Sequence, residues 1–240
     1  MYKKSTDINF GNYYFIKSLF FFKSLYLCQL KMGCNNKFEP KQKILCEAAS
    51  LFMKYGFKSI TMDDIAREMG ISKKTLYNYF TDKNDLVNQT IDEHLEYMET
   101  NCRNIAKEND DAISTMINIT EFVSGTFKQI NYKILFDLKK YFRNAWDKMN
   151  NHRVSYISEN VYQNINLGIS QGLYRSDLDA RLISRLYVHL IDFLVDPDWF
   201  EKEGFDLKHV HHQIIEFHLR AICTEKGLTI LNQKLQKLNA

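Results

Sequence analysis

The near absence of proline is the feature that most constrains what this chain can fold into. Only Pro40 and Pro197 are proline among the 240 residues, so the long stretch between them is free to be helical. No segment alternates apolar and polar residues for long enough to indicate a sheet. The sequence therefore predicts an all-α protein, long enough to bury a sizeable core in one or two domains.

Residues 61–80, TMDDIAREMGISKKTLYNYF, have the pattern of two short helices joined by a three-residue turn. Thr61 suits a helix N-cap, and Asp64, three residues later, gives a weaker form of the capping box. Gly70 suits the left-handed conformation that ends a helix, and Ser72 can cap the second helix. This layout predicts a helix-turn-helix whose second helix enters the major groove of DNA.

The second helix of this motif would turn Leu76 and Phe80 inward and present polar side chains on its outer face. Asparagine can pair with adenine and lysine can donate to guanine, but the pattern does not fix which residue reads a base. The exposed residues are Lys73, Lys74, Thr75, Tyr77, Asn78 and Tyr79.

The net charge of +3 is unevenly spread. Residues 1–37 carry six lysines and one aspartate, residues 38–83 have a net charge of +2, and residues 84–240 have a net charge of −4. An acidic bulk with a mildly basic helix-turn-helix suits a protein that presents one small surface to DNA, although a solvated charged face would look similar. The five cysteines are odd in number and widely spaced, which favours reduced, cytoplasmic thiols over a disulfide framework.

Residues 1–37 differ in character from the rest of the chain. The apolar stretch over residues 10–30 is interrupted by Lys17 and Lys23, so it fits neither a transmembrane helix nor a signal peptide. We expect this extension to lie outside the folded unit, either disordered or upstream of a true start at Met32. The alternative is a basic, aromatic arm that touches DNA or a membrane surface.

Apolar residues recur at helical spacing through most of the remaining chain. The breaks between the helical patterns are only a few polar residues long, as in helical bundles. Besides the helix-turn-helix, the predicted helices cover residues 40–55, 83–107, 112–130, 132–149, 151–171, 177–195 and 207–224, and a short, fraying helix covers residues 227–240.

A series of short motifs lies between residues 55 and 83: Tyr55-Gly56-Phe57, Thr61, Ile65-Ala66, Gly70-Ile71-Ser72, Thr75-Leu76-Tyr77, Tyr79-Phe80 and Lys83. Their order and spacing resemble the N-terminal domain of the TetR family of transcriptional regulators. Residues 168–179, GISQGLYRSDLD, also resemble the joint before that family's dimerisation helices. The resemblance implies a three-helix DNA-binding domain over residues 38–83, a helical ligand-binding and dimerisation domain over residues 84–226, and a C-terminal tail over residues 227–240.

The resemblance also implies which residues contact DNA. Tyr77 and Lys83 match positions that grip phosphates, and Thr61 lies at a helix N-terminus, where phosphate can bind. Because the recognition helix is short, we expect a two-fold dimer on a near-palindromic operator. The candidate DNA-binding residues are Thr61, Ser72, Lys73, Lys74, Thr75, Tyr77, Asn78, Tyr79 and Lys83.

The apolar faces of residues 177–195 and 207–224 are wider than a surface helix needs. A self-complementary pair of such helices would form a four-helix interface across a two-fold axis. The alternative is that both helices are simply core within one chain. The candidate interface residues are Leu182, Leu186, Leu190, Ile214, Phe217, His218 and Ala221.

Aromatic residues are dense between residues 122 and 162. By the family resemblance they would line an effector pocket for a small apolar or aromatic ligand, whereas ordinary core is the other interpretation. The candidate pocket residues are Phe122, Phe127, Phe136, Tyr141, Trp146 and Tyr162.

Metal and enzyme chemistry find little support in the sequence. The histidines of the last helix have no carboxylate or cysteine at familiar ligand spacing, so we expect no metal and no cofactor. A phosphate-cradling glycine loop and a nucleophile elbow are both missing, which argues against an enzyme. The four histidines are His209, His211, His212 and His218.

Together with these patterns, the family resemblance implies a cytoplasmic, homodimeric repressor that a small ligand releases from its operator. One alternative is a DNA-binding protein controlled by a protein partner without a small-molecule effector. A second domain filled by its own side chains would favour that alternative. The other alternative is a membrane-associated protein that uses residues 1–30.

Overall fold

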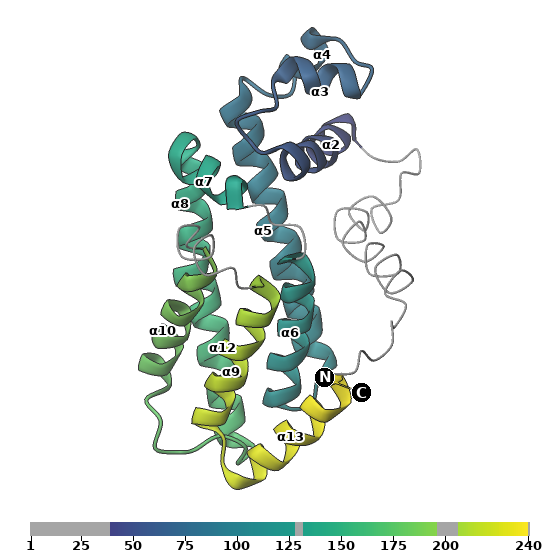
Figure 1. The fold of residues 1–240 in the computed structure, drawn as a ribbon. Coiled ribbons are helices and arrows are strands. Elements are labelled where there is room, and N and C mark those ends of the chain that lie inside the picture. The colour runs from purple at the N-terminus through teal and green to yellow at the C-terminus, as the bar shows by residue number, and fades with distance from the viewer. Residues whose placement is uncertain (1–38, 128–131, 196–205, 240) are drawn as a thin grey trace, which may run out of the picture.

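The computed structural model describes residues 39–127, 132–195 and 206–239. Within these ranges the regular structure is helical, apart from one isolated bridge between Tyr174 and Cys223, and the all-α prediction is confirmed. Figure 1 shows a small head of short helices at one end of α5 and a larger helical bundle along the rest of it. The N-terminal extension predicted over residues 1–37 lies outside the described residues.

The head follows the local sequence signals closely. Its first helix, α2 (Pro40–Tyr55), has proline in the first turn, where the missing N–H costs nothing. The helix-turn-helix consists of α3 (Met62–Glu68) and α4 (Lys73–Tyr77). Gly70, in the turn between them, has a φ of 64°, a left-handed conformation that glycine adopts at little cost.

The longest of the described helices, α5 (Lys83–Glu108), links the head to the bundle. Leu86, Val87 and Ile91 of α5 are buried in the same apolar core as the head, together with residues from α7 and α8. The head therefore does not close on itself, and the domain boundary predicted between residues 83 and 84 coincides with the start of a helix that both parts share.

The bundle differs from the prediction between residues 132 and 149. After α6 (Ala112–Phe127), that stretch forms two helices, α7 (Tyr132–Tyr141) and α8 (Arg143–His152), instead of one. The chain turns at Phe142, whose ring is buried in the head core 5.9 Å from the ring centroid of Phe57. A long-range packing contact causes this break, so no glycine or proline marks it in the sequence.

The break predicted near residue 150 is absent. The helix continues from α8 through a π-helical turn, η1 (Arg153–Ile157), into α9 (Ser158–Ser170). The asparagines at this point are only mildly unfavourable in a helix, so they do not end it. Single π-helical turns inside helices are rare and occur often at functional sites.

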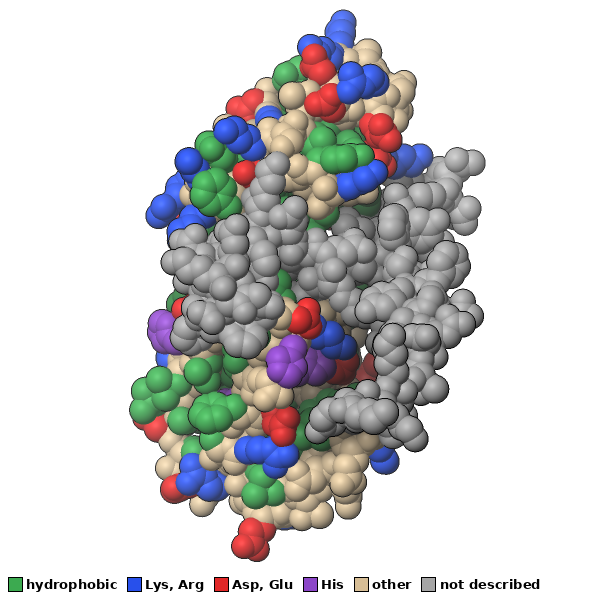
Figure 2. All heavy atoms as spheres, viewed as in Figure 1, with side chains coloured by type: hydrophobic (Ala, Val, Ile, Leu, Met, Phe, Trp, Pro, Cys, Tyr) green, Lys and Arg blue, Asp and Glu red, His purple; other side chains and the backbone are tan. Residues whose placement is uncertain are grey.

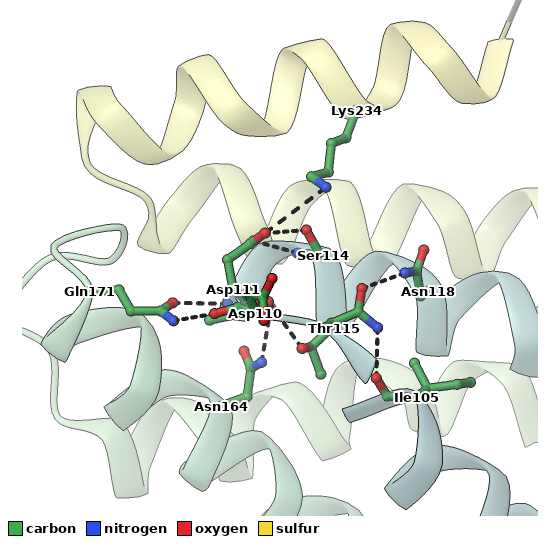
Figure 3. Close-up of polar contacts among 11 residues, drawn as sticks. Ile105, Asp110, Asp111, Ser114, Thr115, Asn118, Asn164, Gln171 and Lys234 are labelled. Atoms are coloured by element: carbon green, nitrogen blue, oxygen red, sulfur yellow. Dashed lines mark hydrogen bonds and ion pairs between the residues drawn. The ribbon is translucent and has the colours of Figure 1, made fainter. Parts of the chain in front are cut away.

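Polar contacts fix the end of the bundle that lies far from the head (Figure 3). The side chain of Gln171 accepts a hydrogen bond from the Ala112 backbone N–H at 3.0 Å and donates one to the Asp110 carbonyl at 2.7 Å. Asp111, in the same turn, lies 4.0 Å from the ammonium of Lys234. These contacts tie the turn between α5 and α6 to the end of α9 and to the C-terminal helix.

The last helices complete the bundle. The predicted helices over residues 177–195 and 207–224 appear as α10 (Ala180–Ile191), a 3-10 turn η2 (Asp192–Val195) and α12 (Leu207–Ile222). The expected short, fraying tail is instead a 15-residue helix, α13 (Glu225–Asn239). Leu231 of α13 is fully buried in the second apolar core, and this packing stabilises a helix that would fray alone.

Membrane-spanning potential can be judged from the same helices. In the part of the chain that the structure describes, no helix combines the length and the apolar character needed to cross a bilayer.

Candidate functional site

The predicted DNA-binding residues begin at the N-terminus of α3, where the capping box is complete. The Thr61 hydroxyl accepts a hydrogen bond from the Asp64 backbone N–H at 3.1 Å. The backbone N–H and the hydroxyl of Thr61 both donate to the Asp64 carboxylate, at 2.9 and 2.6 Å. These bonds lower the pKa of Asp64. Because Asp64 uses both donors of Thr61, a phosphate would have to compete with this carboxylate.

Three further candidates also make contacts within the head. Ser72 caps α4 by accepting a hydrogen bond from the Thr75 backbone N–H at 3.0 Å, and the two hydroxyl oxygens lie 2.8 Å apart. Lys73 forms an ion pair with Asp63 at 2.5 Å, and this contact raises the pKa of Lys73. The ion pair of Lys73 joins α4 to α3, whereas Ser72 and Thr75 stabilise the first turn of α4 itself. Both are structural tasks whether or not DNA is bound.

Three candidates remain on the outer side of α4 and its C-terminal end. Lys74, Tyr77 and Asn78 are exposed, with 49% of Tyr77 accessible to solvent. They offer a cation, a phenol and an amide within five residues. Tyr79, by contrast, is half-buried against the head core. The residues best placed to read DNA are therefore a smaller set than the pattern predicted.

Lys83 braces the loop that precedes the helix-turn-helix. Its ammonium donates to the Lys58 carbonyl at 3.1 Å and lies 5.4 Å from the ring centroid of Phe142. Burial lowers the pKa of Lys83, and the nearby carboxylates of Asp137 and Asp64 oppose that shift. This lysine therefore stands at the junction of the head with α7 and α8.

A cavity of about 290 Å³ lies inside the bundle. It is bounded by α5, α6, the end of α8, η1, α9, α10 and α12, and the π-helical turn contributes Tyr156 and Ile157 to its wall. None of the described residues that line it is an Asp, Glu, Lys or Arg. Its other apolar and sulfur-containing walls include Met98, Cys102, Met116, Ile119, Val161, Leu167 and Ile191.

The titratable groups that line this cavity are held in their neutral forms. Burial lowers the pKa of His211 to about 3 and raises that of Cys102 to about 11. His211 Nδ1 lies 2.9 Å from the hydroxyl of Ser124, which gives its single proton to the Thr120 carbonyl at 2.6 Å. The imidazole must therefore donate through Nδ1. Burial also lowers the pKa of His152, despite Glu99 at 3.3 Å.

Of the six aromatic residues predicted to form an effector pocket, the five whose side chains are described do not line this cavity. Aromatic density marks apolar content, but it does not show which way each side chain of a helix faces. Phe136 and Tyr141 are exposed on α7, and Trp146 packs on the head core. Phe122 lies beside Tyr97 with ring centroids 6.1 Å apart, and the ring centroid of Tyr162 lies 3.9 Å from the guanidinium of Arg181. The side chain of Phe127 is outside the described part.

Comparison with known proteins shows which family the head resembles and which known structures share the fold. Residues 44–90 match the family model described as bacterial regulatory proteins, tetR family. Over 191 residues the chain is 25% identical to YvaF of Bacillus subtilis, an uncharacterized HTH-type transcriptional regulator, which covers 77% of this chain and 96% of the relative. It is 23% identical over 173 residues, 70% of this chain and 86% of the relative, to IcaR of Staphylococcus aureus, the HTH-type negative transcriptional regulator of the biofilm operon icaADBC.

A transcriptional regulator from Cytophaga hutchinsonii, known as a crystal structure, has the same fold. Its TM-score is 0.63 at 20% sequence identity, with 76% of this chain and 98% of that chain covered. The protein is a TetR-family transcriptional regulator. Both named relatives of this TetR-family protein are regulators of transcription.

The predicted dimer-forming residues of this TetR-family protein differ in their exposure to solvent. On α10 and α12, Leu182, Leu186 and Phe217 are 54%, 49% and 66% exposed, although all three are apolar. His218 points the other way, with its ring edge-on to Tyr187 at 4.9 Å and only 5% exposed. We therefore place His218 in the core of the protomer. Of the remaining candidates, Ala221 is exposed, and Leu190 and Ile214 are half-buried.

The histidines of α12 do not assemble a metal site in the described ranges. Over residues 39–127, 132–195 and 206–239, no group of three or more His, Cys, Asp or Glu side chains is placed to hold a metal ion. His211 and His218 lie seven residues apart on α12 and are both buried, so the helical face that they share turns toward the core.

Proposed function

We propose that this TetR-family protein binds a near-palindromic operator as a homodimer and represses transcription until an uncharged, mainly apolar ligand fills the bundle cavity. The observation that carries the ligand part is the cavity itself, whose described lining has no formally charged side chain. A negative regulator among the relatives, IcaR, supports repression as the sign of regulation.

The DNA part rests on the outer side of the helix-turn-helix. Lys74 and Asn78 are exposed and can reach base edges in a major groove. Tyr77 is exposed beside them and can donate its hydroxyl to a phosphate. The apolar residues left exposed on α10 and α12 would pair two protomers. That pairing would set the two α4 helices in successive major grooves, about 34–36 Å apart.

The ligand part follows from the electrostatics of the cavity. A buried ion without a partner loses several kcal/mol of hydration, and the described walls offer only neutral side chains to replace it. Ligand pockets usually measure about 300–1,000 Å³, so the ligand would be at the small end of that range. The presence of a cavity also favours a small molecule over the alternative in which only a protein partner controls the regulator.

Two helices connect the cavity with the head. Tyr156 lines the cavity from η1, and the continuous helix that precedes it buries Ala145 in the head core. Likewise, α5 contributes Cys102 to the cavity and Leu86 to the head core. A ligand that binds one arrangement of these helices more tightly shifts the population toward it. DNA must then weaken ligand binding by the same factor.

The test has a DNA arm and a ligand arm. Selection from a random pool should enrich a palindromic duplex, and no enriched palindrome would contradict the DNA part. The complex of the protein with the selected duplex is then titrated with an alcohol, a carboxylate and an ammonium compound of the same chain length. The alcohol should raise the melting temperature of the protein and weaken operator binding, whereas the two ions should do neither. An alcohol that binds the protein without changing operator affinity would contradict the proposal that a ligand in the cavity controls DNA binding.

A cavity-filling variant supplies the internal control. Ile119→Trp should abolish the effect of the alcohol while operator binding persists, because Ile119 lines the cavity on α6, away from the head. Leu238→Trp places the same side chain on α13, where Leu238 is 47% exposed. This second variant should respond to the alcohol as the unmodified protein does.

A further inference from the structure

The helix α7 presents an exposed stripe beside the head. Phe136, Lys139 and Lys140 are exposed at positions i, i+3 and i+4, so they share one helical face. Ile134 and Leu138 on the opposite face are buried in the head core. This packing holds α7 against the head and keeps the stripe in solvent.

Two cations from different elements converge on one ring at the end of this stripe. The ammonium of Lys58, from the connection between α2 and α3, lies 3.1 Å from the Tyr141 hydroxyl and 4.4 Å from the ring centroid. The ammonium of Lys140 lies 5.4 Å from the same ring and 5.1 Å from that of Phe136. Two like charges held this close repel each other, and a bound anion would relieve the repulsion.

The neighbouring carboxylates offset this charge only in part. Asp137 is buried and accepts its hydrogen bond from the Lys58 backbone N–H, and its carboxylate also attracts the Lys58 ammonium. Asp147 pairs with Arg143 at 3.2 Å, so it offsets the charge of that guanidinium. Lys139 and Lys140 thus leave an excess of positive charge on this flank. Figure 2 shows Lys and Arg side chains gathered with apolar ones over α7, at the upper left.

A cleft of about 190 Å³ opens beside Tyr141, between the start of α5 and the junction of α7 with α8. Its walls include Asn84, Asn88, Arg143 and Asn144. Amide and guanidinium N–H groups are the donors that phosphate oxygens accept from. Asn84, which lines the cleft, directly follows Lys83 in the chain, and the family resemblance associates Lys83 with phosphate contact.

We propose that Lys58, Lys139, Lys140, Tyr141 and Arg143 form an α7 basic surface that binds the phosphate backbone of operator DNA, beside the helix-turn-helix. This inference rests on the proposed operator binding. DNA is the occupant because the surface is continuous with the head: Lys83 donates to the Lys58 carbonyl at 3.1 Å. Contacts to phosphate and sugar usually make up half to two-thirds of the hydrogen bonds at a protein–DNA interface, so a basic surface beside the recognition helix would add to affinity.

The decisive measurement is the salt dependence of DNA affinity. The double substitution Lys139→Gln and Lys140→Gln should reduce the slope of log Kobs against log salt by about 0.9 for each phosphate that the protein no longer neutralises. Both protomers of a dimer carry the substitutions, so affinity near 0.1 M salt should fall at least about 10-fold. The decrease should be equal on the operator and on unrelated duplex DNA, because the backbone is the same in both.

Two control variants separate this surface from general charge effects. Lys107→Gln with Lys237→Gln removes the same charge near the C-terminal ends of α5 and α13, and the slope should stay unchanged. Lys139→Arg with Lys140→Arg keeps the charge and should restore the slope. A Lys139/Lys140 double-glutamine variant with the slope of the unmodified protein would overturn the proposal. So would a decrease confined to the operator sequence, or an equal decrease in the Lys107/Lys237 control.

Failure of this inference differs visibly from failure of the proposed function. If Lys74→Gln and Tyr77→Phe weaken operator binding while the α7 variants do not, the helix-turn-helix binds DNA and the α7 basic surface does not. If the unmodified protein selects no DNA at all, both proposals are wrong. An α7 surface that binds an acidic protein instead would leave the DNA slope unchanged, and that result also counts against it.

Discussion

Asp137 of α7 accepts a hydrogen bond at 2.9 Å from the backbone N–H of Lys58, in the connection that leads into the helix-turn-helix. The Asp137 carboxylate is buried, with 2% of the residue exposed. The bond joins a bundle helix to the segment immediately before α3. Any shift of α7 that follows ligand binding must therefore either move this connection or break the bond.

Replacement of Asp137 tests that linkage. Asp137→Ala should destabilise the protein by about 1–3 kcal/mol, because the Lys58 N–H loses its buried acceptor. Operator affinity should fall as well, since the connection before α3 is no longer held. Urea unfolding and fluorescence anisotropy with operator DNA measure the two effects.

Asp147 provides the comparison for this variant. It forms an exposed ion pair with Arg143 on α8, and such pairs contribute little to stability. Asp147→Ala should therefore unfold at nearly the same urea concentration as the unmodified protein. If Asp137→Ala is equally silent in both assays, the hydrogen bond does not couple the two parts.

The close approach of Tyr174 to Gly168 makes a second prediction. A Cβ at residue 168 would overlap the Tyr174 ring, which is buried and bonds through its hydroxyl to Asn164 at 3.1 Å. Gly168→Ala should therefore cost about 1–3 kcal/mol in urea unfolding. Gly125→Ala, in α6 with no described residue near the added methyl, should be neutral or slightly stabilising. Equal midpoints for the two variants would show that the ring can move aside freely.

The exposed apolar residues of α10 and α12 make a third prediction. Phe217→Glu should convert the dimer to monomers and weaken operator binding, because the charge would be buried in the interface. The fold of the protomer should survive, since Phe217 is 66% exposed there. Sedimentation and circular dichroism test the two parts. Leu238→Glu, on α13, should remain dimeric; a dimeric Phe217→Glu protein would place the interface elsewhere.

The burial of His218 predicts a pH dependence of stability. Burial lowers the pKa of His218 to about 4, below the value of about 6.5 in an unfolded chain. Between these values the unfolded state binds the additional proton, so stability is complete above about pH 6.5 and is lost as the pH falls toward 4. His218→Phe should remove about 1 kcal/mol per pH unit from that slope.

Urea unfolding at pH 5, 6 and 7 measures this slope. Protein concentration must be held fixed, because the proposed dimerisation would contribute to apparent stability. The comparison between His218→Phe and the unmodified protein cancels the contributions of carboxylates that titrate lower. Parallel stability curves for the two proteins would show that His218 takes up its proton in the native state as readily as in the unfolded one.

The sequence alone determined the features that local chemistry controls. The complete capping box of Thr61 and Asp64 spans only four residues, and the left-handed turn at Gly70 depends on one residue's own conformation. The helical periods of α2 and α12 were readable for the same reason, because each helix shows its apolar face within a few turns. These signals predicted the all-α fold and the helix-turn-helix.

Only the tertiary structure decided where each helix faces and which side chains meet. Phe142 interrupts a helical pattern because its ring packs in the head core. Leu231 holds α13 in place because its side chain packs in the core of the bundle. The cavity is likewise lined by Met98, Cys102 and Ile119 and not by the predicted aromatic residues whose side chains are described. A helical period fixes an apolar face only relative to its own axis. The neighbouring helices decide whether that face meets core, cavity, solvent or a second protomer.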